Sequence, residues 1–343
     1  MQQTAAREGG RLIDPPGDLL VDLSAEIVDA GAILERGGAM AAANVYGQEG
    51  LDRLVERRRD LDWFARLLTN DATRFVLGWR ERLPVLDTPE GPRLAAVDHR
   101  ALAGLALGEP VLLGAVDEAI HVAIDATDSA EAELVAALPA GARLAELREI
   151  GALLPGAEAA MAASHRGVLL WHAAQRHCGR CGAPTVAVEA GHTLNCTNTS
   201  CGATHHPRID PAAITLVTDG DRVLLGRNRR RPGSIFTCFA GFVEAGESLE
   251  GAAAREVLEE VGVRLSEVRY HSSQPWPFPA QIMVGFIGTP ATLDIRLDED
   301  EIAEARWFTR EELASLPPDG AVQLPRGDSV ARRMINGWIR GEI

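Results

Sequence analysis

The sequence predicts an α/β fold with a mixed α+β N-terminal half, a short cysteine-rich segment and a C-terminal α/β sandwich. Three observations lead to this prediction. Apolar strand-like runs alternate with helix-like runs after about residue 209. Four of the five cysteines lie between residues 178 and 201. The 343 residues give room for two domains at roughly 150 residues each.

The N-terminal half shows no chemical motif and is expected to be a scaffold. Residues 1–20 are polar with glycine and proline, which predicts a flexible N-terminus. Residues 21–172 are expected to form one α+β domain. Its strands are predicted within 74–86, 92–98 and 110–126, and its helices within 129–138, 144–154 and 156–176. The next expected units are 173–208, which holds the cysteines, and 209–343.

The bulk properties restrict the partners. A net charge of −15 argues against a general nucleic-acid coat, because the phosphate backbone needs a positive surface. An anionic substrate stays open, since a bound cation can invert the charge of a site. No signal peptide and no run of about 20 apolar residues is present, so we expect a cytoplasmic protein without a membrane partner.

The cysteine cluster has the spacing of a metal site. Cys178 and Cys181 form one close pair, and fourteen residues later Cys196 and Cys201 form a second, wider pair. Two such pairs in a reducing compartment suit four thiolate ligands around a structural Zn²⁺. His205 and His206 follow closely and are alternative ligands. Cys238 stands alone and is expected to be a buried small side chain.

The C-terminal unit opens with a predicted hairpin and contains an unusual acidic helix. Two apolar runs meet at 219–221, a turn signal. A helix is predicted over 248–261, capped by Ser248 and ended by Gly262. Apolar residues repeat every fourth position and predict its buried stripe: Leu249, Ala253, Val257 and Val261.

Three glutamates border that stripe. Glu256 and Glu260 are four residues apart and share a face, with Glu259 on the flank. Arg255 is the only basic residue in this helix, and it can turn back to pair with Glu247. An ordinary acidic surface is the alternative, but carboxylates this crowded favour a hard divalent cation. Gly241 and Gly246 bracket a loop where backbone can approach a ligand.

The pattern Gly241-x5-Glu247-x7-Arg255-Glu256-Val257-x-Glu259-Glu260-x-Gly262-Val263 resembles the complete Nudix box. The resemblance implies a Nudix fold and hydrolysis of a nucleoside diphosphate linked to another moiety. It further implies that Glu256, Glu259 and Glu260 bind Mg²⁺ or Mn²⁺, and that Glu247 and Arg255 organise the site.

The reaction class does not identify the substrate, for which the segment "SQPWPFP" at 273–279 is informative. Its three prolines exclude a helix and favour a rigid loop. Trp276 and Phe278 on that loop are expected to form a stacking wall for flat rings, or else a hydrophobic plug in the core.

This segment, the four cysteines before the Nudix box and the smaller domain before them are similar to the bacterial NADH pyrophosphatase branch of the Nudix hydrolases. The resemblance implies a zinc ribbon, a Nudix-like N-terminal domain, and cleavage of NADH or NAD to nicotinamide mononucleotide and AMP. It also implies a homodimer with Trp276 in the partner's pocket, and in some members removal of NAD caps from RNA.

The site residues that the resemblance implies fall into two groups. The metal positions are Glu256, Glu260 and Glu301 with the backbone of Ala240. The substrate positions are Phe242, Gln274, Pro275, Trp276, Pro277, Phe278, Pro279, Gln281, His206 and Ala331. Gln281 and His206 depart from the serine and tyrosine of the family, which affects substrate preference more than chemistry.

Other functions remain open on the sequence. A broader Nudix hydrolase would act on ADP-ribose or other dinucleotides. A protein of another class would be a zinc-ribbon RNA-binding module that only senses a nucleotide. The arginines of "GRNRRRPG" at 226–233 are either a solvated loop or a contact for a substrate phosphate or an RNA chain.

Overall fold

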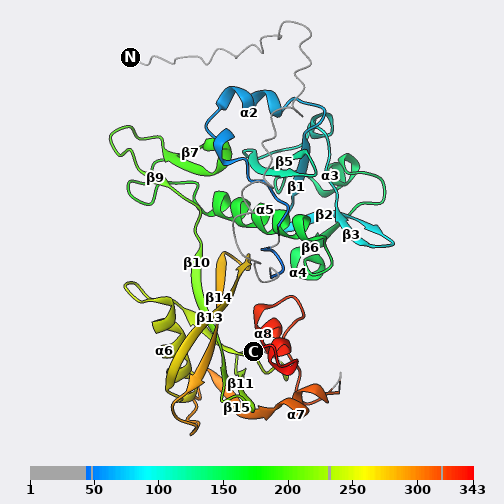
Figure 1. Cartoon of the computed structure of the whole chain (residues 1–343). Coiled ribbons are helices and arrows are strands. Elements are labelled where there is room, and N and C mark those ends of the chain that lie inside the picture. The colour runs from blue at the N-terminus through cyan, green and yellow to red at the C-terminus, as the bar shows by residue number, and fades with distance from the viewer. Residues whose placement is uncertain (1–43, 48, 231–232, 318–319) are drawn as a thin grey trace, which may run out of the picture. The chain divides into compact units, whose positions relative to one another are not determined.

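The computed structural model describes residues 44–47, 49–230, 233–317 and 320–343. The predicted flexible segment 1–20 lies outside these residues, as do residues 21–43 of the predicted N-terminal domain. Figure 1 shows the elements of the described chain with their labels.

Two three-stranded sheets form the N-terminal half. Their orders are β1-β5-β4 and β3-β2-β6, with β1 parallel to β5 and the other pairs antiparallel. The strands are β1 (Arg74–Gly78), β2 (Arg82–Thr88), β3 (Gly91–Leu94), β4 (Val111–Val116), β5 (Ala119–Asp125) and β6 (Arg143–Glu146). The helices are α2 (Leu61–Leu67), α3 (Glu131–Ala137), α4 (Leu147–Ile150) and α5 (Gly156–Ala174), with 3-10 turns η2 (Val55–Arg57) and η3 (His99–Leu102).

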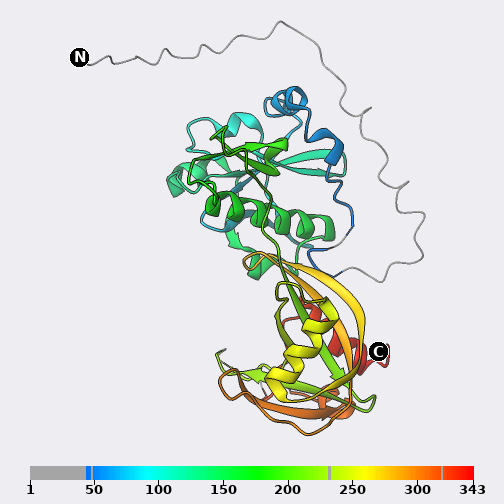
Figure 2. The same cartoon turned by 90° about the vertical axis from the view of Figure 1, so that its left-hand side faces the viewer.

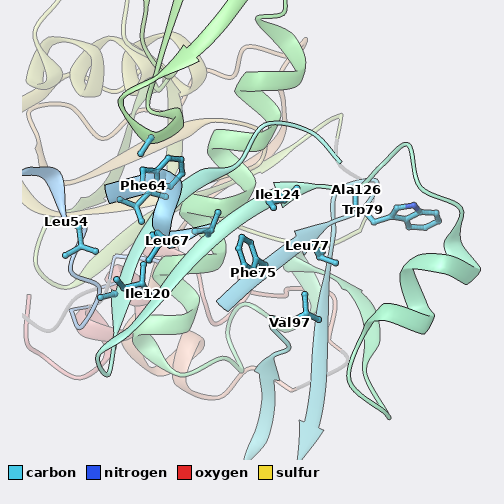
Figure 3. Close-up of a cluster of buried hydrophobic side chains, with 14 of the residues drawn as sticks. Leu54, Phe64, Leu67, Phe75, Leu77, Trp79, Val97, Ile120, Ile124 and Ala126 are labelled. Atoms are coloured by element: carbon cyan, nitrogen blue, oxygen red, sulfur yellow. The ribbon is translucent and has the colours of Figure 1, made fainter. Parts of the chain in front are cut away.

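Apolar side chains fill the space between these elements. In Figure 3, Phe75 and Leu77 from β1 lie near Leu67 of α2 and Ile124 of β5, within one buried cluster. Phe75 and Leu77 are each 1% exposed. The cluster joins α2, β1 and β5 into one core, as an α+β domain requires.

The helix predicted over 144–154 is wrong in its first part. Residues Arg143–Glu146 form β6, which pairs with β2 so that Leu83 lies opposite Ala145. Only Leu147–Ile150 is helical. The distant partner strand supplies the backbone hydrogen bonds, and this long-range pairing overrides a local helical pattern.

The cysteine-rich segment is a small antiparallel sheet. It is formed by β7 (Thr185–Val188), β8 (Thr193–Cys196) and β9 (Thr204–His205), with the 3-10 turn η4 (Glu189–Gly191) between β7 and β8. The two cysteine pairs lie beside these strands, one before β7 and the other at the end of β8 and in the turn that follows.

The C-terminal unit is a sheet covered by a helix on each face. The sheet order is β13-β14-β10-β11-β15, with β12 also paired to β10. Figures 1 and 2 show α6 on one face and α8 on the other. The elements are β10 (Asp210–Thr218), β11 (Arg222–Asn228), β12 (Phe239–Phe242), α6 (Leu249–Val261), β13 (Leu265–Trp276), β14 (Gln281–Pro290), β15 (Ile302–Thr309), α7 (Arg310–Ala314) and α8 (Val330–Ile339).

Alternation along β10 explains how one sheet carries both helices. Ile214 and Leu216 pack in the cluster that includes α8, whereas Ala213 and Val217 pack in clusters that include α6. Successive side chains of a strand point to opposite faces, so both faces of β10 are apolar. The predicted hairpin between β10 and β11 is confirmed, with the Arg222 amide donating to the Asp219 carboxylate at 2.8 Å.

The prediction of a loop over 273–279 is correct only for the second half of the segment. Residues up to Trp276 belong to β13, and the turn begins at Pro277. Pro275 lies opposite Ile282 of β14. Because β13 is an edge strand in the order above, a proline can occupy it where its missing N–H has no partner to lose.

Candidate active site

The acidic helix forms where its local signals predict. The Ser248 hydroxyl accepts a hydrogen bond from the Gly251 amide at 3.0 Å, and Gly262 ends the helix with a left-handed φ of 71°. Ala253 and Val257 are fully buried against the sheet. Leu249, predicted in the same stripe, is instead 36% exposed because it lies in the first turn, at the edge of the covered face.

Glu260 is the most buried carboxylate of this helix, with only 6% of its surface exposed. Burial raises its pKa to about 8, and the charges of Glu256 and Glu301 act in the same direction. The backbone amide of Ala240 donates to it and partly offsets this effect. The pKa of Glu256 is also raised, first by burial and then by Glu259 and Glu301.

Arg255 connects the loop before the helix to the helix itself. Its guanidinium donates to both oxygens of Glu247, at 2.8 and 2.9 Å, and to the Phe242 carbonyl at 2.9 Å. The predicted Arg255–Glu247 pair is therefore present, and it lowers the pKa of Glu247 to about 2. Arg255 also contacts Glu256 at 2.6 Å and Glu259 at 2.9 Å, which the sequence did not indicate.

Strand β12 brings backbone and an aromatic ring to the same place. A Cβ on Gly241 would lie 2.0 Å from the Glu256 carboxyl carbon, so the carboxylate occupies the space that any side chain there would need. The next residue, Phe242, is 53% exposed. Its carbonyl is bound by Arg255, and its exposed ring is free to stack on a flat ligand.

Glu301 faces this cluster from the turn before β15. Its charge contributes to the raised pKa of both Glu256 and Glu260. The basic segment approaches it as well, since the Arg230 guanidinium lies 3.7 Å from the Glu301 carboxylate and the Arg229 amide donates to its carbonyl at 2.7 Å. Arg231, the fourth arginine of that segment, lies outside the described residues.

The carboxylates fit a hard divalent cation by chemistry and electrostatics. Glu256 and Glu260 are desolvated acids that repel each other and Glu301, and a dication relieves such repulsion. In the described part of the chain, however, no three of these carboxylates bring one oxygen each within 4.8 Å of one another. Arg255 holds Glu256 and Glu259, so a cation would compete with this guanidinium for Glu256.

The four predicted cysteine ligands converge. Their sulfur atoms all lie within 4.8 Å of one another, with Cys178 to Cys201 at 3.9 Å and Cys181 to Cys196 at 3.4 Å. Tetrahedral Zn²⁺ with bonds of about 2.3 Å separates its sulfurs by about 3.8 Å, so the spacing suits zinc. Neither His205 nor His206 belongs to the converging group among the described residues.

The predicted substrate segment packs within its own chain. Trp276 lies edge-on to Phe278 with ring centroids 5.2 Å apart, and Tyr46 lies edge-on to both, at 6.4 and 6.0 Å. Arg166 donates to the Pro277 carbonyl at 2.7 Å, and its guanidinium lies 5.4 Å from the Phe278 ring. These contacts match the plug alternative more closely than an open stacking wall.

The other predicted substrate positions have different surroundings. Gln274 is fully buried, and its amide bonds to the backbone of Val45, Asp328 and Val330. Ala331 is 3% exposed in the core cluster that includes α8. His206 and Pro279 are exposed, Pro275 and Gln281 are half-buried, and Pro277 is buried. Of this set, Phe242 is connected to the carboxylates, because Arg255 donates both to its carbonyl and to Glu256.

The sequence reasoning missed Tyr46 and Arg166, the residues that hold the aromatic segment. Both lie more than 100 positions before it, and neither belongs to a recognisable motif. No local signal could have identified them. The prediction that Cys238 is buried is confirmed, because the residue is 3% exposed. Burial raises the pKa of its thiol.

Comparison with known proteins finds three family models that match successive parts of the chain between residues 72 and 327. Residues 208–327 match the NUDIX domain, residues 72–171 match the NADH pyrophosphatase-like rudimentary NUDIX domain, and residues 173–205 match the NADH pyrophosphatase zinc ribbon domain. None of the helices in the described residues has the length and apolarity required to cross a bilayer.

Individual relatives agree with these matches. NAD-capped RNA hydrolase NudC of Mycobacterium bovis is 37% identical over 290 residues, which cover 79% of this chain and 90% of that protein. NAD-capped RNA hydrolase NUDT12 of Homo sapiens is 40% identical over 194 residues, which cover 53% of this chain. The matched part is 42% of the human protein, so the chain spans less than half of that relative.

Proposed function

Because the chain belongs to the Nudix hydrolase family, in the branch with an NADH pyrophosphatase zinc ribbon, we propose that it hydrolyses the diphosphate bond of NADH or NAD. The products are nicotinamide mononucleotide and AMP. The observation that carries the proposal is Glu260, a buried carboxylate that faces Glu256 and Glu301 and has no basic partner among the described residues. Such a group is stabilised by a cation that arrives with the substrate or before it.

The proposed catalytic cation is Mg²⁺ or Mn²⁺, held by Glu256, Glu259, Glu260 and Glu301 with the backbone of Ala240. When bound, it supplies charge neutralisation at the diphosphate and a more acidic water. The chain's own residues prepare the site. Arg255 positions Glu247 and the Phe242 carbonyl, and Gly241 leaves the volume that the Glu256 carboxylate occupies.

Two features support a dinucleotide as the substrate. The exposed ring of Phe242 offers a surface on which a base can stack. The Arg230 guanidinium and the Arg229 backbone amide lie beside Glu301, close enough to the carboxylates for this segment to meet a phosphate. An RNA chain attached to the adenosine side would extend from the same place, and the names of the relatives in the comparison favour NAD-capped RNA as a further substrate.

Further parts of the proposal concern assembly and location. The zinc ribbon is structural, because four cysteines leave no open coordination position. Reduced thiols of this kind suit the cytoplasm. We also propose a homodimer. Within one chain the Trp276 ring packs on Tyr46. Contact of Trp276 with the partner subunit is therefore a separate part of the proposal, with its own test.

Substrate competition tests the function. The purified chain, with Mg²⁺ or Mn²⁺ added, is given NADH, NAD, ADP-ribose and an NAD-capped RNA in equal amounts, and the products are resolved by chromatography. Release of AMP with nicotinamide mononucleotide from NADH or NAD is the expected result. Cleavage of ADP-ribose alone would favour the broader Nudix hydrolase, and binding without any cleavage would favour the nucleotide sensor.

A further inference from the structure

A cavity of about 550 Å³ lies on the α8 side of the sheet, away from the acidic helix. Strand β13 contributes Arg269 and His271, and α8 contributes Arg333 and Asn336. None of the predicted metal or substrate residues lines it. Its volume lies within the range of small-molecule sites, roughly 300–1,000 Å³.

The carboxylates and the side-chain amide oxygens that line this cavity already receive hydrogen bonds. Asp328 accepts from the Arg326 guanidinium with both oxygens at 3.1 Å. Glu342 accepts from Arg340 at 2.6 and 2.7 Å. The side-chain carbonyl of Asn336 accepts from Arg332 at 3.1 Å. That of Asn44 accepts from Arg333, also at 3.1 Å.

The donors, in contrast, have capacity to spare. Among the described residues, no carboxylate oxygen lies within 4.0 Å of Arg269 or Arg333, and the Arg269 guanidinium makes no hydrogen bond to a described residue. Arg333 uses one nitrogen for Asn44. The amide nitrogen of Asn336 has no acceptor in this part of the chain.

His271 adds a further donor. Asn44 donates to the Ser272 hydroxyl at 3.0 Å, so that hydroxyl can donate to Nδ1 of His271, 2.8 Å away. The imidazole then carries its proton on Nε2. Burial lowers its pKa, and Arg333 and Arg269 act in the same direction, which keeps the ring neutral and places both guanidinium groups near it.

We propose that this cavity binds the phosphate group of a nucleotide, between Arg269 and Arg333, at a site separate from the carboxylates. A cavity with several unused donors and occupied acceptors requires a ligand rich in acceptors. A phosphate has such oxygens and also carries the negative charge that two guanidinium groups favour. The phosphate belongs either to a free mononucleotide or to a nucleotide within an RNA chain.

Calorimetric titration distinguishes the two sources. The host is the Glu260→Gln full chain without added divalent cation, so hydrolysis does not consume the ligand. The probes are AMP, adenosine and an uncapped RNA octamer. Arg269→Ala is the first test variant, because its side chain makes no bond that folding would miss. Arg333→Gln is the second. Arg264→Ala is the control, because Arg264 is exposed and does not line the cavity, and its substitution changes the charge as Arg269→Ala does.

We expect Arg269→Ala and Arg333→Gln each to weaken AMP binding by roughly tenfold or more, the usual cost of losing one charged hydrogen bond. Arg264→Ala should leave AMP binding unchanged. The same dependence seen only with the octamer would assign the phosphate to an RNA chain. The proposal is overturned if neither ligand responds to either arginine, or if adenosine binds as tightly as AMP. Neither result bears on NADH hydrolysis, since the host is inactive.

Discussion

The two halves of the chain each bury one glutamate on a helix, and they treat it in opposite ways. Glu158 on α5 is 8% exposed and has a complete set of partners, with the Arg93 guanidinium at 2.5 Å and the Leu94 amide at 2.7 Å. Glu260 on α6 is 6% exposed and faces two other carboxylates. A buried carboxylate with its own cation stabilises a fold, whereas one without a cation among the described residues indicates a binding site.

The same difference distinguishes the N-terminal scaffold from the C-terminal site, although both halves match NUDIX-type domains. The N-terminal half matches a rudimentary NUDIX domain, yet its buried glutamate is neutralised within the chain. The C-terminal half keeps its carboxylates near one another, and Arg255 connects them to the backbone of Phe242, whose ring is exposed. Only the second arrangement leaves charge for an external cation to bind.

The same substitution at both glutamates should give opposite results. Glu260→Gln removes a carboxylate from the cluster, so we expect turnover of NADH to fall by about a hundredfold or more. Its unfolding temperature should hold or rise, since a desolvated and repelled charge is lost. Glu158→Gln should retain turnover but lose about 1–2 kcal/mol of stability, because Arg93 loses its charged partner.

Steady-state kinetics with NADH and thermal unfolding of the two variants measure this contrast. Loss of turnover in Glu158→Gln, with the fold intact, would remove the distinction between scaffold and site. Normal turnover in Glu260→Gln would contradict the role given to that carboxylate.

Substitution of Arg255 should reduce turnover at the same site by a smaller factor. Arg255→Lys keeps the charge but loses the fork that holds Glu247 and the Phe242 carbonyl together, so we expect kcat to fall by about tenfold while KM changes less. Raising the Mg²⁺ concentration should recover part of the loss if the variant disorders the carboxylates. An unchanged kcat would mean that Arg255 serves only the stability of the loop.

The pH dependence of stability should differ between the halves. Burial lowers the pKa of His165 and of His192 to about 4, so their contribution is complete above pH 6.5 and is lost as the pH falls towards 4. The contribution of Glu260 to stability changes with pH in the opposite direction. Its folded pKa of about 8 exceeds the unfolded value, so the stability it contributes is present at low pH and is lost as the pH rises through 8.

Without added divalent cation, unfolding of the wild-type chain between pH 7 and 9 should therefore show a loss of about 1 kcal/mol that Glu260→Gln lacks. Below pH 6.5 the wild type should lose less stability than Glu260→Gln, because the protonated Glu260 carboxyl gains in contribution until the pH falls below its unfolded pKa. His165→Gln should reduce the acid loss in either protein. A wild-type curve that stays flat above pH 7 would show that Glu260 is already ionised.

Local signals predicted the site better than they predicted its surroundings. Ser248 and Gly262 define the ends of α6 because capping acts within a few residues. The spacing of the glutamates places Glu256 and Glu260 on one face for the same reason. The strand at Arg143–Glu146 depends instead on a partner about sixty positions away, so a helical pattern misled the prediction.

The aromatic segment shows the same limit. Its composition predicted two alternatives, a stacking wall and a plug. The contacts that favour the plug come from Tyr46 and Arg166, which share no motif with it. The bonds from Arg255 to Glu256 and Glu259 were also hidden, because neighbouring positions on a helix do not reveal side-chain direction.

Titration with Mn²⁺, followed by electron paramagnetic resonance, tests the central claim most directly, because it requires no substrate. The wild type and Glu158→Gln should bind the ion equally, and Glu260→Gln should bind it at least about tenfold more weakly. Equal Mn²⁺ affinity in all three proteins would contradict the account that the buried carboxylates of α6 form the divalent-cation site.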